Sequence, residues 1–299
     1  MTRVPPGQTA IGTGRPLATL RRRNHVCVVS EGGADTEERF VDLKSVSQKL
    51  HARSAALLLS LENRLEHILI GWLLFAGLCS AARIAVSPLP HGTLPALAGA
   101  APYLLVVTAP FISTMLALRW FGDGDKHAQP STRLAVVGSW RTVSKAEARR
   151  HPLYGTTGIM VSLLLGMLLN VPIRALEYLA AIPPVGPVSP NWLSTLRFTM
   201  TLDVVLFTSL YAIAFVAALR RAPLFPRLLV AIWLGDLTMQ LVIANMAAAA
   251  HLPGGVAVAL HGLLEGNLKK VLISMAIWLP YLLMSKRVNV TYRQRVPAA

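Results

Sequence analysis

The chain has 299 residues, of which 54% are hydrophobic and only 14% are charged, and its mean hydropathy is +0.51. Soluble globular proteins carry about 25% charged residues, so this composition excludes a disordered acidic protein and a typical water-soluble enzyme. The formal net charge is +15, which indicates a negatively charged partner, either nucleic acid or an anionic lipid surface. Because the basic residues lie between long apolar segments, the sequence predicts anionic phospholipids and not nucleic acid as that partner.

Residues 1–64 are expected to form a cytoplasmic N-terminal region. The arginine run at 21–23 is followed by polar residues and not by an apolar core, so no secretory signal peptide is predicted. Residues up to Phe40 show no sustained periodicity and are predicted to be largely disordered. Between residues 41 and 62 a helical pattern places four apolar side chains on one face, namely Val46, Leu50, Leu57 and Leu61. This segment is interpreted either as a basic amphipathic helix on the cytoplasmic leaflet or as an ordinary solvated helix.

Six apolar stretches follow, and a membrane-spanning helix needs about 20 such residues. They cover residues 68–86, 94–118, 156–171, 198–219, 228–250 and 271–284. Prolines inside these stretches are compatible with spanning helices, because neighbouring helices can satisfy the freed backbone groups. The expected fold class is therefore all-α, a polytopic integral membrane bundle of about six transmembrane helices.

The sixth stretch is short, because Lys269 and Lys270 precede it. Its length falls below the hydrocarbon thickness of about 30 Å. Two interpretations stay open. Lysines at both ends could reach the interfaces along their apolar stems, or residues 256–264 could extend the helix or enter the membrane as a re-entrant segment.

Lysine and arginine alternate between the connections and so predict the topology. They are frequent in the N-terminal region, in residues 119–155, in the link at 220–227 and in the C-terminal segment, whereas the other three connections contain none. The positive-inside rule then places both termini in the cytoplasm of a bacterial inner membrane.

The same pattern sets the expected organisation of the chain. A two-helix unit at 65–121 precedes a basic cytoplasmic loop at 122–155, a four-helix unit at 156–287 and a cytoplasmic tail at 288–299. The basic residues of the loop either contact lipid headgroups or serve only to orient the chain.

The C-terminal sequence contains a recognisable motif. Ala-Ile-Trp-Leu-Pro-Tyr at 276–281 runs into Ser-Lys-Arg-Val at 285–288 and then Thr291-Tyr292, and the basic turn at 220–227 includes Phe-Pro-Arg. These features resemble the bacterial membrane family catalogued as domain of unknown function 2569, matched mainly over residues 150–295. The resemblance implies a four-span membrane core and no established activity.

Two departures from the family pattern stand out. The usual opening Gly-Gly-Trp-Leu is matched only by Gly-Trp-Leu-Leu at 71–74, in the first apolar stretch and not the third. Either the family core begins there with two helices inserted, or the first two helices are an additional unit. Tyr292 stands where the family usually has Phe.

Five basic residues are predicted to anchor the cytoplasmic face. Arg220, Arg221 and Arg227 surround a tight turn, where Pro226 suits the first turn of the following helix. Lys286 and Arg287 are expected to close the last helix, satisfying its terminal carbonyls and binding lipid phosphate.

Asp236 is the most informative polar residue inside a predicted span. It follows Pro226 by about 15 Å of helix, which places it near the bilayer midplane, where an aspartate costs about 2.5–3.5 kcal/mol. Gln240 lies one turn further on the same face. Asp236 is interpreted either as part of a proton or cation relay or as a hydrogen-bonded carboxyl that fixes helix packing.

Three further ionisable residues lie in the predicted spans. Asp203 is expected about 9 Å from the outer end of the fourth span, as a second relay residue or an interfacial polar contact. Arg174 and Glu177 are three residues apart near the outer end of the third span and are predicted to form an interfacial ion pair.

No catalytic, phosphate-binding or metal-binding motif is found, so no enzyme activity, cofactor or metal is expected. Two hypotheses remain. The first is a non-enzymatic membrane protein that supports envelope organisation or serves as an accessory subunit, through packing with itself or with a membrane-protein partner. The second is a small proton-coupled transporter or permease that uses Asp236.

Overall fold

A computed structural model describes residues 49, 51–86, 93–122, 124, 127–131, 138–184 and 190–298. All of them belong to one compact unit, Gln48–Ala299. The prediction of disorder up to Phe40 and the apolar positions Val46 and Leu50 lie outside the described residues.

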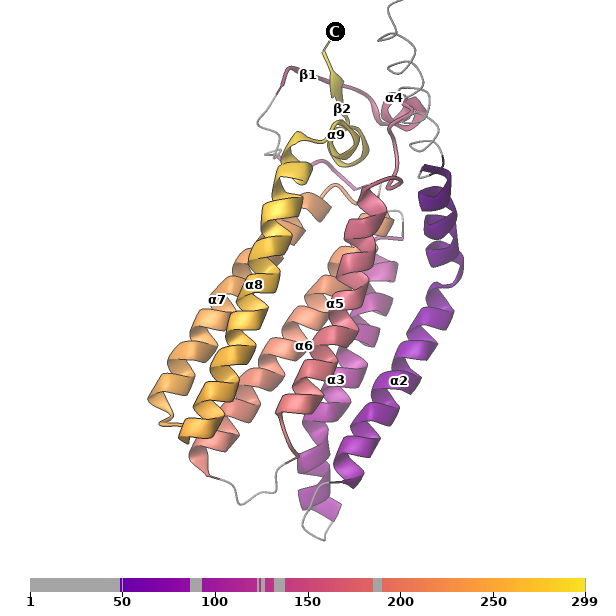
Figure 1. Cartoon of the computed structure of the whole chain (residues 1–299). Helices are drawn as coiled ribbons and strands as arrows, with labels where there is room; N and C mark the ends of the chain where they lie inside the picture. The colour runs from indigo at the N-terminus through magenta and orange to yellow at the C-terminus, as the bar shows by residue number, and fades with distance from the viewer. Residues whose placement is uncertain are drawn as a thin grey trace, which may run out of the picture. The chain divides into compact units, whose positions relative to one another are not determined.

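The predicted all-α bundle is confirmed (Figure 1). Within the described residues, six helices are long and apolar enough to cross a bilayer, so the chain has the architecture of a multi-pass membrane protein. These helices are α2 (Leu65–Ala85), α3 (Thr93–Trp120), α5 (Met160–Ala181), α6 (Asn191–Leu219), α7 (Phe225–Ala249) and α8 (Gly254–Met284).

Three of the helices are longer than their apolar stretches predicted. The helix α5 continues past Val171 to Ala181, and α6 already begins at Asn191. The helix α8 has 31 residues and contains Lys269 and Lys270 near its middle. Residues 256–264 therefore extend the helix, and the re-entrant alternative is wrong. Hydropathy made these spans too short because polar and charged side chains, such as Arg174 and Lys270, interrupt the apolar runs.

The helix α6 forms the centre of the bundle. It packs against α3, α5 and α7, and 67% of its apolar window is buried, compared with 11% for α2 and 17% for α8. The larger of the two clusters of buried apolar residues includes Phe207, Phe215, Trp233 and Leu164. The peripheral helices α2 and α8 consequently present most of their apolar surface outward, as membrane-embedded helices do.

The two-helix unit and the four-helix unit pack together. Within the two-helix unit, the Trp72 indole of α2 donates a hydrogen bond to the carbonyl of Val107 on α3, 2.9 Å away, and α3 in turn packs against α6 of the four-helix unit. On α3, the Tyr103 hydroxyl donates to the carbonyl of Ile182 at the end of α5, also at 2.9 Å. The Tyr103 and Tyr178 rings meet edge-on at 6.0 Å.

Residues 51–63 form a helix that precedes α2 and is separated from it by a turn at Arg64. Leu58 and Leu61 are buried, whereas Leu57 is 49% exposed. The predicted apolar face that contains Leu57 and Leu61 is therefore covered only in part by the rest of the chain. The buried face passes through Ser54, whose hydroxyl accepts a hydrogen bond from the Gly158 amide at 2.9 Å and so ties this helix to the start of α5.

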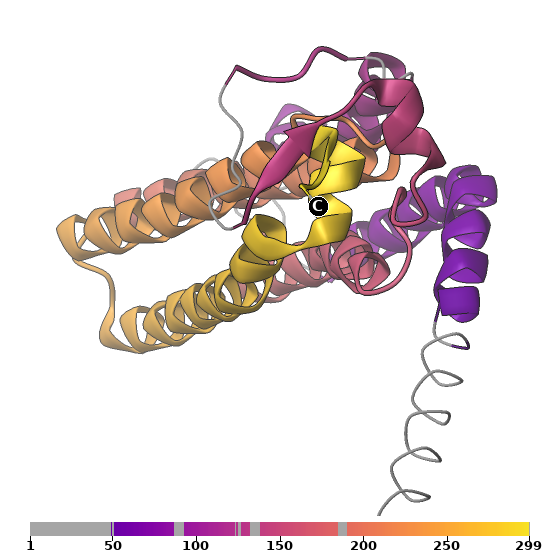
Figure 2. The ribbon, with the colours of Figure 1, turned by 90° about the horizontal axis from the view of Figure 1, so that it is seen from above.

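A small cap covers the end of the bundle where the basic segments gather (Figures 1 and 2). It combines α4 (Lys145–Arg150), β1 (Trp140–Thr142), α9 (Lys286–Arg293) and β2 (Arg295–Pro297). The two strands are antiparallel and pair Trp140 with Pro297 and Thr142 with Arg295. The C-terminal segment predicted as a tail therefore contributes a helix and a strand to this cap.

The helix α9 is held by residues of the C-terminal motif. Ser285 is its N-cap, and its hydroxyl accepts a hydrogen bond from the Val288 amide. The Tyr292 hydroxyl donates to the Ala218 carbonyl at 2.9 Å, and burial raises the pKa of Tyr292, so the phenol stays a donor. The motif thus has a structural explanation, and the hydroxyl that distinguishes Tyr292 from Phe has a partner.

Candidate intramembrane ionic site

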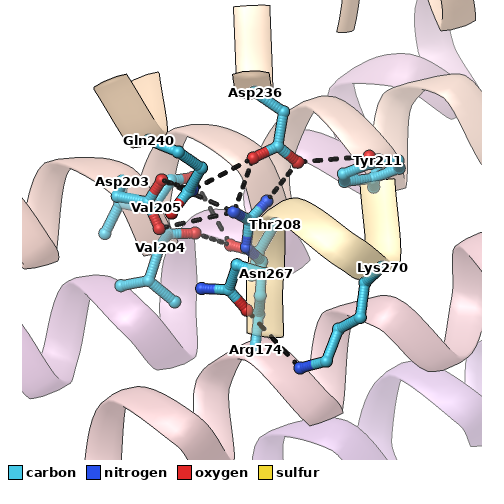
Figure 3. Close-up of polar contacts among 10 residues, drawn as sticks. All are labelled: Arg174, Asp203, Val204, Val205, Thr208, Tyr211, Asp236, Gln240, Asn267 and Lys270. Atoms are coloured by element: carbon cyan, nitrogen blue, oxygen red, sulfur yellow. Dashed lines mark hydrogen bonds and ion pairs between the residues drawn. The ribbon is translucent and has the colours of Figure 1, made fainter. Parts of the chain in front are cut away.

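An arginine and two aspartates meet inside the bundle (Figure 3). Arg174 of α5 donates two hydrogen bonds to Asp236 of α7, from Nη1 to Oδ2 and from Nη2 to Oδ1, both 2.7 Å long. The same Nη2 lies 3.5 Å from both carboxylate oxygens of Asp203 on α6. This Arg174 network therefore connects three consecutive spanning helices.

Three neighbours complete the network. The Gln240 amide nitrogen lies 3.3 Å from Asp203 Oδ1 and 3.3 Å from Asp236 Oδ1, and donates to both carboxylates. The Tyr211 hydroxyl donates to Asp236 Oδ2 at 3.3 Å. The Arg174 guanidinium also lies over the Phe207 ring, 5.0 Å from its centroid.

Helix periodicity explains how each element contributes. On α6, Asp203, Phe207 and Tyr211 recur every four residues and share one face. On α7, Asp236 and Gln240 have the same spacing and face α6. A single guanidinium between these two faces reaches both carboxylates, because its planar fork can donate in several directions.

Burial makes these contacts important for the stability of the bundle. Arg174, Asp203, Asp236 and Gln240 are 6%, 3%, 1% and 4% exposed. An isolated charge in this environment is strongly unfavourable, so each member depends on the others. The network carries one cation and two carboxyl groups, an imbalance that distinguishes it from a simple ion pair.

A second polar contact joins α5 to α8. The ammonium group of Lys270 pairs with Glu177 and lies 3.4 Å from the side-chain oxygen of Asn267. The Lys270 and Glu177 side chains are 50% and 31% exposed, so this contact lies at the edge of the bundle.

Two expectations for these residues are corrected. Arg174 and Glu177 do not pair with each other, because Arg174 turns toward α6 and α7 whereas Glu177 turns toward α8. Asp203 is not near the outer end of its helix. The helix α6 begins at Asn191, which places Asp203 about 18 Å from that end. The predicted shared face of Asp236 and Gln240 agrees with their 3.3 Å contact.

Four residues of these contacts were not predicted from the sequence, namely Tyr211, Phe207, Asn267 and Lys270. The four-residue spacing from Asp203 could have indicated the first two. Nothing in the sequence shows that Lys270 meets Glu177, because these residues are 93 positions apart.

The basic turn forms part of the cap. Arg220 is the C-cap of α6, and Arg221 has a left-handed backbone with φ 57°. Its guanidinium lies 5.6 Å from the centroid of the Tyr154 ring. Gly124 approaches the carbonyl of Arg220 so closely that an added Cβ would lie 2.3 Å from that oxygen. Arg227 lies inside α7, in its first turn.

Lys286 and Arg287 do not close α8, which ends at Met284. They begin α9, with Ser285 between the two helices. Arg287 Nη1 donates to the Thr157 hydroxyl at 2.7 Å and so contacts the start of α5, whereas Lys286 is exposed. The prediction that both side chains terminate the last spanning helix is therefore wrong.

No known family, curated protein or solved structure matches this chain. Among the described residues, no group of three or more His, Cys, Asp or Glu side chains is arranged to hold a metal ion. The geometry defines a multi-pass membrane bundle with a buried ionic network at its centre.

Proposed function

We propose that the chain is a non-enzymatic protein of the bacterial inner membrane that assembles with a second membrane-embedded chain through the outward face of α8. Both termini are cytoplasmic in this proposal, because the basic segments gather at the cap end of the bundle and cytoplasmic loops are enriched in lysine and arginine. Exposed basic side chains of the cap, such as Lys286, then face anionic phospholipid headgroups. The resemblance to the uncharacterised four-span family stays a prediction and adds no activity.

Charged residues on the outward face of α8 carry the proposal. Glu265 and Lys269 form an ion pair of 2.6 Å, and their side chains remain 50% and 67% exposed. Lys269 is about 22 Å from either end of α8, which places it near the middle of the membrane. Charges facing lipid at this depth are costly, and residues of this kind normally face protein or water. A partner that covers this face removes that cost.

The shape of the same face suits a helix partner. His261, Glu265 and Lys269 recur every four residues and form one stripe. Beside it, Gly262 and Gly266 form a Gly-x-x-x-Gly pair, and a Cβ added to either would meet no heavy atom of the described chain within 4 Å. Small residues at this spacing allow two spanning helices to approach closely.

A second copy of the chain is the partner that fits best. The stripe carries charges of both signs, so it can be complementary to itself. In a two-fold dimer with its axis along the membrane normal, the carboxylate of one copy approaches the ammonium group of the other. Closed two-fold dimers are also the commonest symmetric assembly of identical chains.

Disulfide cross-linking in native membranes tests this interface. A chain with Cys27→Ser and Cys79→Ala is used as background, and a cysteine is introduced at Val258, which is 75% exposed on α8. Leu78→Cys, at 70% exposure on α2, is the matched control. We expect a covalent dimer from the α8 variant alone. Equal cross-linking from both positions would refute a specific interface, and products with other proteins would refute the second copy.

A proton-coupled transporter is the second candidate function. The observation that favours it is the Arg174 network, in which two buried carboxyl groups share one cation. Ion flux into proteoliposomes tests it. Loss of flux in Asp236→Asn with the fold preserved supports transport, and unchanged flux removes the relay.

A further inference from the structure

We infer that the Arg174 network binds one proton at Asp203, so that the buried site is electrically neutral. This inference rests on the proposed membrane embedding and deepens the second candidate function, but it does not depend on assembly through α8. It is supported by the unequal hydrogen bonding of the two carboxyl groups, by burial and by an acceptor without a partner.

The two aspartates differ in how closely they contact Arg174. Asp236 accepts two guanidinium hydrogen bonds of 2.7 Å, one on each oxygen, and a third from Tyr211 at 3.3 Å. Among the described residues, Asp203 receives only the 3.5 Å contacts from Arg174 and one 3.3 Å bond from Gln240. Bidentate ion pairs with short hydrogen bonds are stronger than single, longer contacts. Asp236 is therefore the carboxylate that neutralises the positive charge of Arg174.

If Asp203 were ionised, its negative charge would have no close cation. Asp203 is 3% exposed, and a buried carboxylate that is not compensated becomes protonated in preference to staying charged. The other carboxyl group of the network, Asp236, brings no positive charge to Asp203, although Gln240 contacts both. Lys270 of α8 does not supply the missing charge, since it pairs with Glu177.

Gln240 gives independent support for a bound proton. Its amide nitrogen donates to both carboxyl groups, but its side-chain oxygen is buried and has no hydrogen-bond partner among the described residues. Ionised carboxylates accept hydrogen bonds and cannot donate them. A protonated Asp203 has an O–H group, which is the kind of donor that the buried Gln240 oxygen lacks. The proton comes from a hydronium ion of the surrounding water, whose O–H bond breaks as the Asp203 O–H bond forms, so that a water molecule is left.

Infrared spectroscopy of the full chain in nanodiscs tests for the proton. Aspartate labelled with ¹³C at its side-chain carboxyl identifies bands that arise from aspartate. We expect a protonated-carboxyl band at neutral pH that is lost in Asp203→Asn. Absence of the band in the wild-type chain would overturn the inference, and so would its persistence in Asp203→Asn.

Unfolding measurements determine which aspartate holds the proton. Asparagine resembles a protonated aspartate, so Asp203→Asn should keep the denaturation midpoint of the wild-type chain. Asp236→Asn removes the close partner of Arg174 and should lower the midpoint clearly. An equal loss in both variants, or a larger loss in Asp203→Asn, would overturn the assignment to Asp203. None of these outcomes affects the α8 interface, which the cross-linking experiment tests separately.

Discussion

Replacement of Arg174 by methionine tests the energetic importance of the buried network. The change removes two charge-assisted hydrogen bonds of 2.7 Å to Asp236 and leaves two carboxyl groups, 1% and 3% exposed, without their shared cation. Removing one partner of a buried ion pair costs about 3–5 kcal/mol. Proteins are stable by about 5–15 kcal/mol, so this loss is a large fraction of the total.

A matched control separates burial from hydrogen-bond distance. The Arg141–Glu147 pair in the cap is also 2.7 Å long, but its side chains are 63% and 46% exposed. Arg141→Met should therefore cost less than about 1 kcal/mol. Reversible unfolding in mixed micelles measures both variants under the same conditions.

A double variant tests whether the loss arises from uncompensated charge. Arg174→Met combined with Asp236→Leu removes both members of the close pair, and Asp203 can then remain neutral. Because apolar replacement of a complete buried pair is often neutral, this variant should recover most of the stability lost in Arg174→Met. The reasoning is refuted if Arg174→Met costs no more than Arg141→Met, or if the double variant is no more stable than the single one.

Two further changes test the cap. Tyr292→Phe removes the hydrogen bond to Ala218 and keeps the ring, so unfolding should become easier by about 0.5–1.5 kcal/mol, and an unchanged midpoint would contradict the role of the hydroxyl. Gly124→Ala places a Cβ 2.3 Å from the Arg220 carbonyl oxygen, so limited proteolysis should cleave the cap faster. Gly71→Ala is its control, because no described heavy atom lies within 4 Å of the added Cβ, and equal cleavage of both variants would contradict the packing argument.

The number of spanning helices could be predicted from the sequence, but several of their ends could not. Apolar composition identifies a helix that must face lipid, and it worked for α2, which is mostly exposed. It failed where charged side chains are neutralised by tertiary partners, as at the C-terminal half of α5 and around Lys270 in α8. A composition window cannot distinguish a charge that ends a span from a charge that is paired inside the bundle.

The candidate site could also be predicted only in part. The contact between Asp236 and Gln240 follows from spacing within one helix and could be predicted. The partner of Arg174 could not, because Asp236 is 62 positions away and the contact depends on how α5 and α7 are rotated. Glu177 was the obvious local partner for Arg174, and the structure shows that tertiary partners displaced it.

The position of α9 has a consequence for biosynthesis. Thr291 exchanges hydrogen bonds with Gly155, which lies 136 positions earlier in the chain, so the surface around the start of α5 is completed by a segment that leaves the ribosome much later. Membrane insertion of α5 and completion of the surface around it by α9 are therefore separate events. Until α9 emerges, a nascent chain with α5 already inserted would still expose an unfinished patch to proteases and chaperones.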